Sequence, residues 1–136
     1  MLVLKAPRRL LLLRGDHVLR DYEVSLGRNP AGPKRRQGDG RTPEGRYSID
    51  WRSAESRFHR ALHISYPNAD DLDFARRAGT APGGDVMTHG LPDGASWVGE
   101  VQREYDWTNG CIAVTDDEMN EIWELVDDGT PIEIRP

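Results

Sequence analysis

The stretch Asp106-Trp107-Thr108-Asn109-Gly110-Cys111 holds the only cysteine of the chain, directly behind a glycine. The apolar residues 112–114 follow at once, so the stretch predicts a loop that delivers Cys111 to the start of a β-strand. Upstream, His89 closes another short apolar segment and precedes Gly90. A thiol, a histidine that accepts its proton and backbone amides beside a glycine are what a thiolate nucleophile needs.

Cys111 has other interpretations. Free cysteines are among the residues most often buried, so a structural cysteine explains Cys111 and His89 equally well. A metal site would join Cys111 to His59, His63 or His89. The chain has no CxxC or HExxH motif, so we expect neither a metal nor a cofactor.

A binding module without turnover is the alternative from a different functional class. It would use tryptophans as a ligand platform, and Trp97 and Trp107 flank the cysteine segment. Packing explains these two side chains equally well, so the choice depends on the reactivity of Cys111. A base would lower the pKa of the thiol and activate it, whereas an inert thiol favours the binding module.

The composition is that of one globular domain covering residues 1–136, of which 37% are hydrophobic and 30% charged. The net charge of −5 argues against nucleic-acid binding. No apolar run approaches the roughly 18 residues of a membrane span. The leucines at 10–13 form too short a run for a signal peptide, so we expect no export signal in the chain as given. The oligomeric state is left open.

Local patterns predict mostly strands, with two short helices. Residues 10–13 and 18–25 bracket an Arg-Gly-Asp turn, which indicates a β-hairpin. Gly79 ends a helix over 68–78, and Thr115 with Glu118 forms the capping box of a second helix that Gly129 ends. In that helix, Met119, Ile122, Trp123 and Val126 form the buried stripe. Further strands are expected at 3–4, 46–51, 61–66, 85–89, 112–114 and 132–134. We expect a mainly β (α+β) fold, an antiparallel sheet arranged as a sandwich or barrel.

Residues 27–45 are rich in glycine and proline, which predicts a long shaped loop of the kind that often serves function. Lys34, Arg35, Arg36 and Arg41 cluster within it. Such a charge cluster is usually a solvated face, and contact with substrate carboxylates is the other interpretation.

Several motifs, in this order along the chain, resemble a known family: Gly38-Asp39-Gly40-Arg41-Thr42-Pro43-Glu44-Gly45, Ser65-Tyr66-Pro67-Asn68, Gly83-Gly84-Asp85-Val86-Met87-Thr88-His89-Gly90, the segment 106–113 and Gly129-Thr130-Pro131-Ile132-Glu133-Ile134. Together they are similar to YkuD-type L,D-transpeptidase catalytic domains, and to their YafK-like subgroup. The resemblance covers almost the whole chain. Asn109 stands where the family usually has a second histidine, and Ala113 and Val114 stand where many members have Arg or Asn.

The resemblance implies roles for individual residues. Cys111 would be the nucleophile, His89 the general base and later acid, and the Gly90 carbonyl the group that orients the imidazole. Backbone N–H groups of Gly110 and Cys111 would form the oxyanion hole. Apart from the resemblance, the candidate substrate-binding residues are those beside the cysteine, Trp107, Thr108, Asn109 and Trp97, and Arg41 of the basic loop.

The implied substrate is a peptidoglycan stem peptide. The thiolate would attack the carbonyl of an L-centre, expel a D-amino acid and leave a thioester acyl-enzyme. An amine acceptor would then give transpeptidation, and water would give hydrolysis, including release of a wall-linked lipoprotein. The resemblance implies a periplasmic or cell-envelope location.

Overall fold

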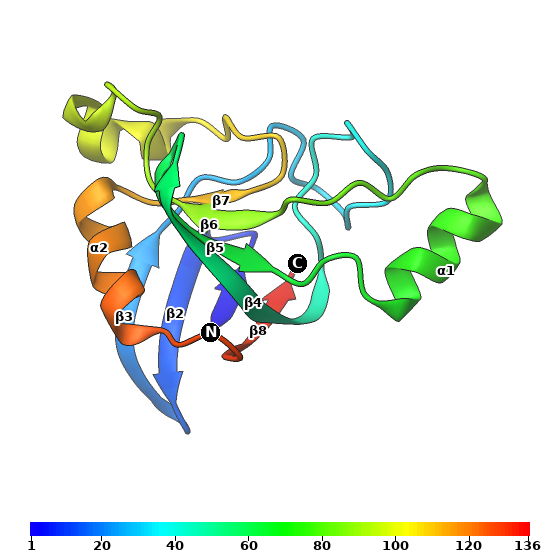
Figure 1. Cartoon of the computed structure of the whole chain (residues 1–136), viewed down its shortest axis with the longest axis horizontal. Coiled ribbons are helices and arrows are strands. Elements are labelled where there is room, and N and C mark those ends of the chain that lie inside the picture. Colours follow the sequence, from blue (N-terminus) through cyan, green and yellow to red (C-terminus); the bar gives the residue numbers. More distant parts are fainter.

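The computed structural model describes all residues from Met1 to Pro136 and shows a mainly β fold with three short helices (Figure 1). The strands are β1 (Leu2–Leu4), β2 (Arg9–Arg14), β3 (His17–Glu23), β4 (Gly45–Ser56), β5 (His59–Ile64), β6 (Met87–His89), β7 (Ile112–Ala113) and β8 (Pro131–Arg135). The helices are α1 (Ala69–Ala78), the 3₁₀ segment η1 (Ser96–Glu104) and α2 (Asp116–Leu125). The predicted fold class is confirmed, and η1 is the helix that the sequence patterns miss.

The strands form one sheet in the order β3-β2-β1-β8-β4-β5-β6-β7. Most neighbours are antiparallel, as predicted, but β1 with β8 and β6 with β7 are parallel. These two pairs are the exceptions to the expected antiparallel arrangement. They join strands far apart in the chain, and side-chain alternation within a strand does not report the direction of its neighbour.

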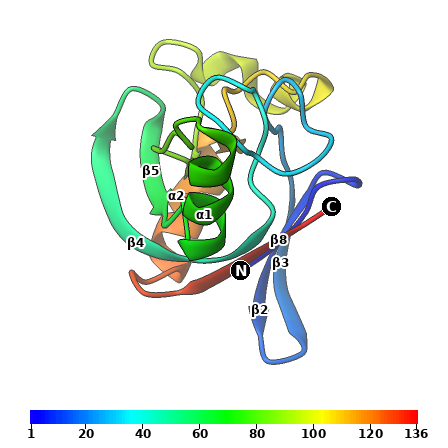
Figure 2. The same cartoon turned by 90° about the vertical axis from the view of Figure 1, so that its right-hand side faces the viewer.

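The two ends of this sheet meet, which gives the barrel-like closure. Ser25, just after β3, exchanges two backbone hydrogen bonds with Ala113 of β7, of 3.0 and 2.9 Å. Gly27 forms a second bridge with Thr108. Figure 2 shows the long β4–β5 hairpin curling over one side while the β2–β3 hairpin projects from the other. Nineteen buried residues form the core between these strands. The closure brings the loop after β3 beside the loop before β7.

Helix α2 covers the core as its stripe predicts. The Thr115 hydroxyl accepts the Glu118 N–H and the Glu118 carboxylate accepts the Thr115 N–H, which completes the predicted capping box. Met119, Ile122 and Val126 are buried, and Trp123 packs partly against the core. The helix ends at Leu125, earlier than predicted, because Val126 already has an extended backbone.

Helix α1 begins and ends as predicted, with Asn68 as its N-cap and Gly79 in the left-handed conformation after it. Only Asp71 and Ala75 of this helix are buried. In η1, Gly99 has φ of 53° and interrupts the helical backbone, so no continuous helical period marks the segment in the sequence. None of the three helices is both long and apolar enough to cross a bilayer.

Candidate active site

Cys111 and His89 are brought together by the parallel pair β6–β7. His89 ends β6 opposite Ala113, and Cys111 immediately precedes β7. Successive side chains of a strand point to opposite faces, so Cys111 and Ala113 share the face on which His89 lies. Both side chains line one cleft of about 800 Å³. The fold therefore places the predicted pair in a common cavity.

The His89 ring is held in one orientation. Its Nδ1 lies 2.7 Å from the Gly90 carbonyl oxygen, which can only accept, so Nδ1 carries the proton and Nε2 is left as an acceptor. The ring stacks on Phe58 with centroids 4.4 Å apart, and the Trp107 ring lies 5.8 Å away. Only 3% of His89 is exposed. Burial lowers the pKa of His89 to about 4, although the bond to Gly90 acts in the opposite direction.

The Cys111 thiol is partly exposed, and its Sγ lies 3.6 Å from the Asp85 carbonyl oxygen, to which it donates. Burial raises the pKa of this thiol, while the Met87 backbone and the Lys34 charge act in the opposite direction. The sequence argument expects a lowered thiol pKa. The direction is reversed because desolvation dominates and the neighbouring histidine is neutral.

Thr108 braces the backbone beside Cys111. Its Oγ1 accepts the Gly110 N–H at 3.1 Å and donates to the Cys111 carbonyl at 2.7 Å. The Cys111 N–H makes no hydrogen bond within the chain. Of the two amides expected for an oxyanion hole, one is thus already engaged and the other is free.

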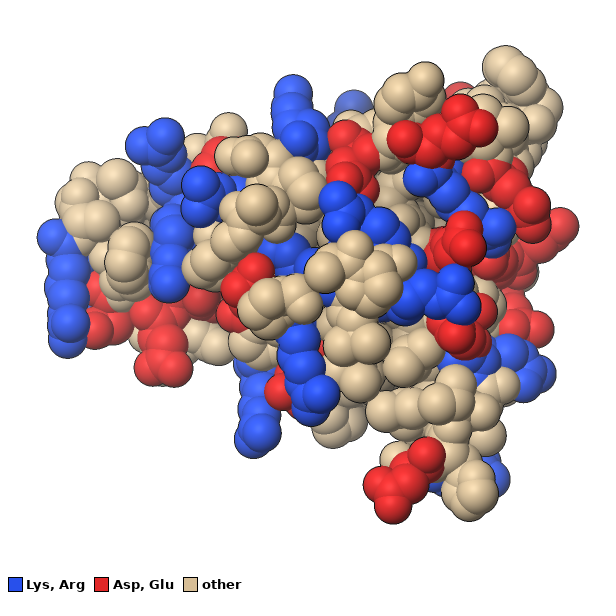
Figure 3. Space-filling model, turned by 180° about the vertical axis from the view of Figure 1, so that it is seen from behind, with Lys and Arg blue, Asp and Glu red and all other residues tan.

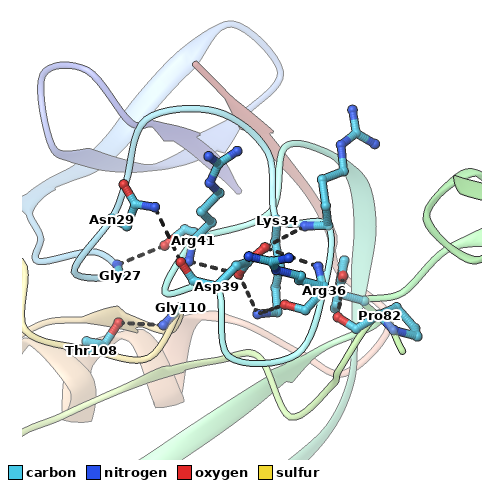
Figure 4. Close-up of polar contacts among 12 residues, drawn as sticks. Gly27, Asn29, Lys34, Arg36, Asp39, Arg41, Pro82, Thr108 and Gly110 are labelled. Atoms are coloured by element: carbon cyan, nitrogen blue, oxygen red, sulfur yellow. Dashed lines mark hydrogen bonds and ion pairs between the residues drawn. The ribbon is translucent and has the colours of Figure 1, made fainter. Parts of the chain in front are cut away.

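Gly110 has φ of 134°, and a Cβ placed on it would lie 2.6 Å from the Arg41 carbonyl oxygen. A Cβ on Gly27 would lie 2.2 Å from the Gly40 carbonyl oxygen. These close approaches bring the shaped loop of residues 27–45 against the cysteine segment, as the close-up in Figure 4 shows around Gly27, Arg41 and Gly110. Only glycine allows the three backbones to come so near one another.

The family model of the L,D-transpeptidase catalytic domain, YkuD, matches residues 1–134. The chain belongs to the YkuD family. YafK of Escherichia coli K12, a provisionally named L,D-transpeptidase, is 33% identical over 111 residues, which are 80% of this chain and 37% of YafK. The chain therefore spans little more than a third of that relative.

Solved structures share the fold of this YkuD domain. The helical cell shape determining protein Pgp2 from Campylobacter jejuni has a TM-score of 0.70 at 23% identity, covering 98% of this chain and 46% of Pgp2. An L,D-transpeptidase from Mycobacterium smegmatis has a TM-score of 0.64 at 17% identity, covering 99% of this chain and 57% of that one.

The substrate-binding residues expected from the sequence fall into two groups. Trp107, Thr108 and Asn109 line the cleft of the YkuD domain together with Cys111. Trp97 lies on η1, is 83% exposed and does not line the cleft. The Arg41 side chain does not line it either, and in Figure 4 it points away from Gly110. Arg41 contributes its backbone carbonyl to the loop contact instead.

The histidines considered for a metal site have other partners. His59 Nε2 lies 2.6 Å from Asn120 Oδ1. His63 Nδ1 lies 2.6 Å from Asp50 Oδ1, and its ring stacks on Trp51. Neither histidine lines the cleft that holds Cys111.

Two residues of the site were missed by sequence reasoning. Phe58, at the turn between β4 and β5, forms the stacking partner of His89. Lys34 is buried beside the cysteine segment, although its charge cluster was expected to be solvated. Its neighbour Asp39, which ion-pairs with Lys34 at 3.0 Å, was the one available signal.

Proposed function

We propose that this YkuD domain is a cysteine acyltransferase that acts on peptidoglycan stem peptides through a thioester acyl-enzyme, as an L,D-transpeptidase. The observation that carries the proposal is the orientation of His89. Its Nδ1–H is bound to the Gly90 carbonyl, so Nε2 is unprotonated in the cleft that also holds the only thiol. A general base has to offer such an acceptor to the proton that it removes.

In the resting protein, the raised pKa of Cys111 and the lowered pKa of His89 keep both groups uncharged at neutral pH. We therefore propose that the proton moves as the sulfur attacks. His89 Nε2 takes the thiol proton while Sγ bonds to the carbonyl carbon of the L-centre. The C–N bond then breaks, and the same proton passes to the leaving amine, which departs as a D-amino acid.

The free N–H of Cys111 is the donor best suited to the developing oxyanion. It makes no hydrogen bond within the chain and belongs to the residue whose sulfur attacks. The Gly110 N–H would contribute only after Thr108 Oγ1 gave up its bond. We propose the Cys111 amide as the principal donor of the hole.

The second step decides between two reactions. An amine acceptor that attacks the thioester carbon displaces Sγ, which regains a proton through His89, and gives a cross-link or a protein attachment. Water attacking the same carbon gives hydrolysis. Hydrolysis is the second candidate function, because Cys111 lines an open cleft of about 800 Å³ that has room for water beside the thioester. Residues 1–136 would form a single catalytic domain that works in the periplasm or cell envelope, where this substrate is found.

The test is mass spectrometry of tetrapeptide muropeptides incubated with the wild type and with Cys111→Ala. Loss of D-alanine with formation of dimers supports a transpeptidase, and loss without dimers supports a hydrolase. We expect Cys111→Ala to abolish turnover with an unchanged thermal unfolding curve, and His89→Ala to slow acylation by about 10²–10⁴-fold. Activity in Cys111→Ala would refute the cysteine mechanism, and a wild type that binds muropeptides without turnover would be a binding module.

A further inference from the structure

A second, smaller hollow of about 230 Å³ adjoins the cleft at Cys111. Cys111 and Asn109 line both cavities. His89 lines only the larger one, whereas Lys34 and Arg28 line only the smaller one. Cys111 therefore lies between a side lined by His89 and Arg57 and a side lined by Lys34 and Arg28, and the exposed Asp85 lines both.

Lys34 is held rigidly at this hollow with one donor to spare. Its side chain is 4% exposed, and its Nζ donates to Asp39 Oδ1 at 3.0 Å and to the Arg36 carbonyl at 3.2 Å (Figure 4). An ammonium group has three N–H donors, so one has no acceptor within the chain. Because Lys34 lines the hollow, this donor is available to water or to an anionic ligand there.

Asp39 balances the charge of Lys34 but accepts only one of its three N–H donors, and its carboxylate also accepts three backbone N–H groups. It accepts the backbone N–H groups of Arg35 at 2.8 Å and of Arg36 and Arg41 at 3.1 Å each. Burial raises the pKa of Asp39, but these three bonds and Lys34 outweigh burial and lower it overall. The acidic Asp85 at the rim is exposed, and its Oδ1 lies 3.9 Å from His63, which lines neither cavity.

The net charge of the chain does not attract an anion to Cys111. The chain carries a net charge of −5, and Figure 3 shows basic and acidic side chains interspersed over the face opposite to the view of Figure 1. The cations that line the two cavities at Cys111 are Arg57 in the larger one and Arg28 and Lys34 in the smaller one, and of these only Lys34 is buried.

We propose that the smaller hollow is a carboxylate subsite, in which Lys34 binds the free carboxylate of the amino acid that leaves during acylation. The inference rests on the proposed function, because attack by Cys111 defines which residue leaves. The carboxylate of a terminal amino acid is on the same residue as the scissile nitrogen, so it lies close to the sulfur that attacks. Arg28 at the mouth adds a second cation. The subsite selects a terminal residue over an internal peptide bond.

Lys5 provides a matched control for Lys34. It is also buried, with its side chain 4% exposed and an ion pair to Glu44 of 2.9 Å. Its Nζ donates to Gly32 O, Thr42 O and Glu44 Oε2, so all three donors are satisfied within the chain. Lys5 lines neither cavity at Cys111. Its role is structural, and replacing it should leave recognition of the carboxylate intact.

The experiment measures binding in the Cys111→Ala background, so that no turnover intervenes. Isothermal titration calorimetry compares a stem tetrapeptide ending in D-alanine with the same peptide carrying a C-terminal amide. We expect the free acid to bind about tenfold to a hundredfold more tightly, as for one charge-assisted hydrogen bond. Adding Lys34→Met should abolish this preference, and adding Lys5→Met should preserve it.

Equal or undetectable binding of acid and amide by Cys111→Ala would overturn the subsite, as would a preference that persists in Lys34→Met. If Lys34→Met unfolds, the double change Lys34→Met with Asp39→Asn removes both buried charges and answers the same question. Turnover by the wild type is scored separately. A preference for the acid without turnover refutes the proposed acyl transfer but supports the carboxylate subsite. Turnover without a preference for the acid supports the acyl transfer but refutes the subsite.

Discussion

His89 is uncharged because it is buried, and its burial makes the unfolding free energy of the protein depend on pH. Its pKa is lowered to about 4 in the folded protein, against 6.5 for an exposed histidine. Above pH 6.5, the folded and unfolded states both carry a neutral imidazole. Between pH 6.5 and 4, only the unfolded state takes up the proton, so stability falls as the pH is lowered and levels off below about 4.

We predict that His89→Gln removes this pH dependence. The wild type should lose up to about 3 kcal/mol of unfolding free energy between pH 6.5 and 4 relative to the variant, which has no titrating ring. Urea denaturation of both proteins across this range measures the difference. Parallel curves would show that His89 has an ordinary pKa and is not desolvated.

Thr108 is predicted to hold the site through its hydroxyl. Thr108→Val removes the acceptor for the Gly110 N–H and the donor to the Cys111 carbonyl, which should cost about 1–3 kcal/mol of stability and lower turnover. Thr130→Val is the control, because the Thr130 hydroxyl makes one exposed bond to Asp127 O. Thermal unfolding and muropeptide turnover are measured for both. Equal losses in the two variants would contradict the bracing role.

The sequence pointed to Cys111 and His89 because their chemistry is unusual and the flanking glycines are recognisable. The structure places both in one cleft, and their catalytic roles stay a prediction. For the basic cluster with Lys34, the sequence left a solvated face and a substrate contact both open, since only the folded loop buries Lys34 against Asp39. Trp97 was assigned to the site by its nearness in sequence. Its side chain instead points into solvent from η1.

Helices and loops differ in how much the sequence revealed of them. Helix α2 was predicted because its cap and buried stripe are local patterns repeated over a few turns. The path of the 27–45 loop was not predicted, because it depends on contacts with residues 106–111, which lie far away in the chain. Glycine and proline there indicated only that the loop is shaped.

Gly110 tests that loop-to-loop contact. Gly110→Ala should lower the unfolding free energy by about 1–3 kcal/mol more than Gly94→Ala. Both glycines have positive φ, so both variants share the backbone strain, but only at Gly110 does the new Cβ meet a backbone atom, Arg41 O. Chemical denaturation measures the stabilities, and turnover should fall only in Gly110→Ala. If Gly110→Ala and Gly94→Ala were equally destabilised, the loop of residues 27–45 and the segment 106–111 would separate at little cost in free energy.

For the molecule as a whole, the bridge between Ser25 and Ala113 joins the two ends of the sheet. We predict that these two amides exchange with deuterium as slowly as the core amide of Ile64, and on the order of a hundredfold more slowly than Val18 at the projecting hairpin. Hydrogen exchange followed by NMR checks this. Similar amide exchange rates for Ser25 and Val18 would show that the sheet opens at the bridge between Ser25 and Ala113.

The position of β8 has a consequence for the order of assembly. This strand lies between β1 and β4, yet it follows every other strand in the chain. During synthesis on the ribosome, β1–β3 and β4–β7 emerge first as two groups whose facing edges have no partner. Unpaired edges invite association between chains. Closure of this sheet therefore waits on β8, and we expect the two groups to be prone to association until β8 has left the ribosome.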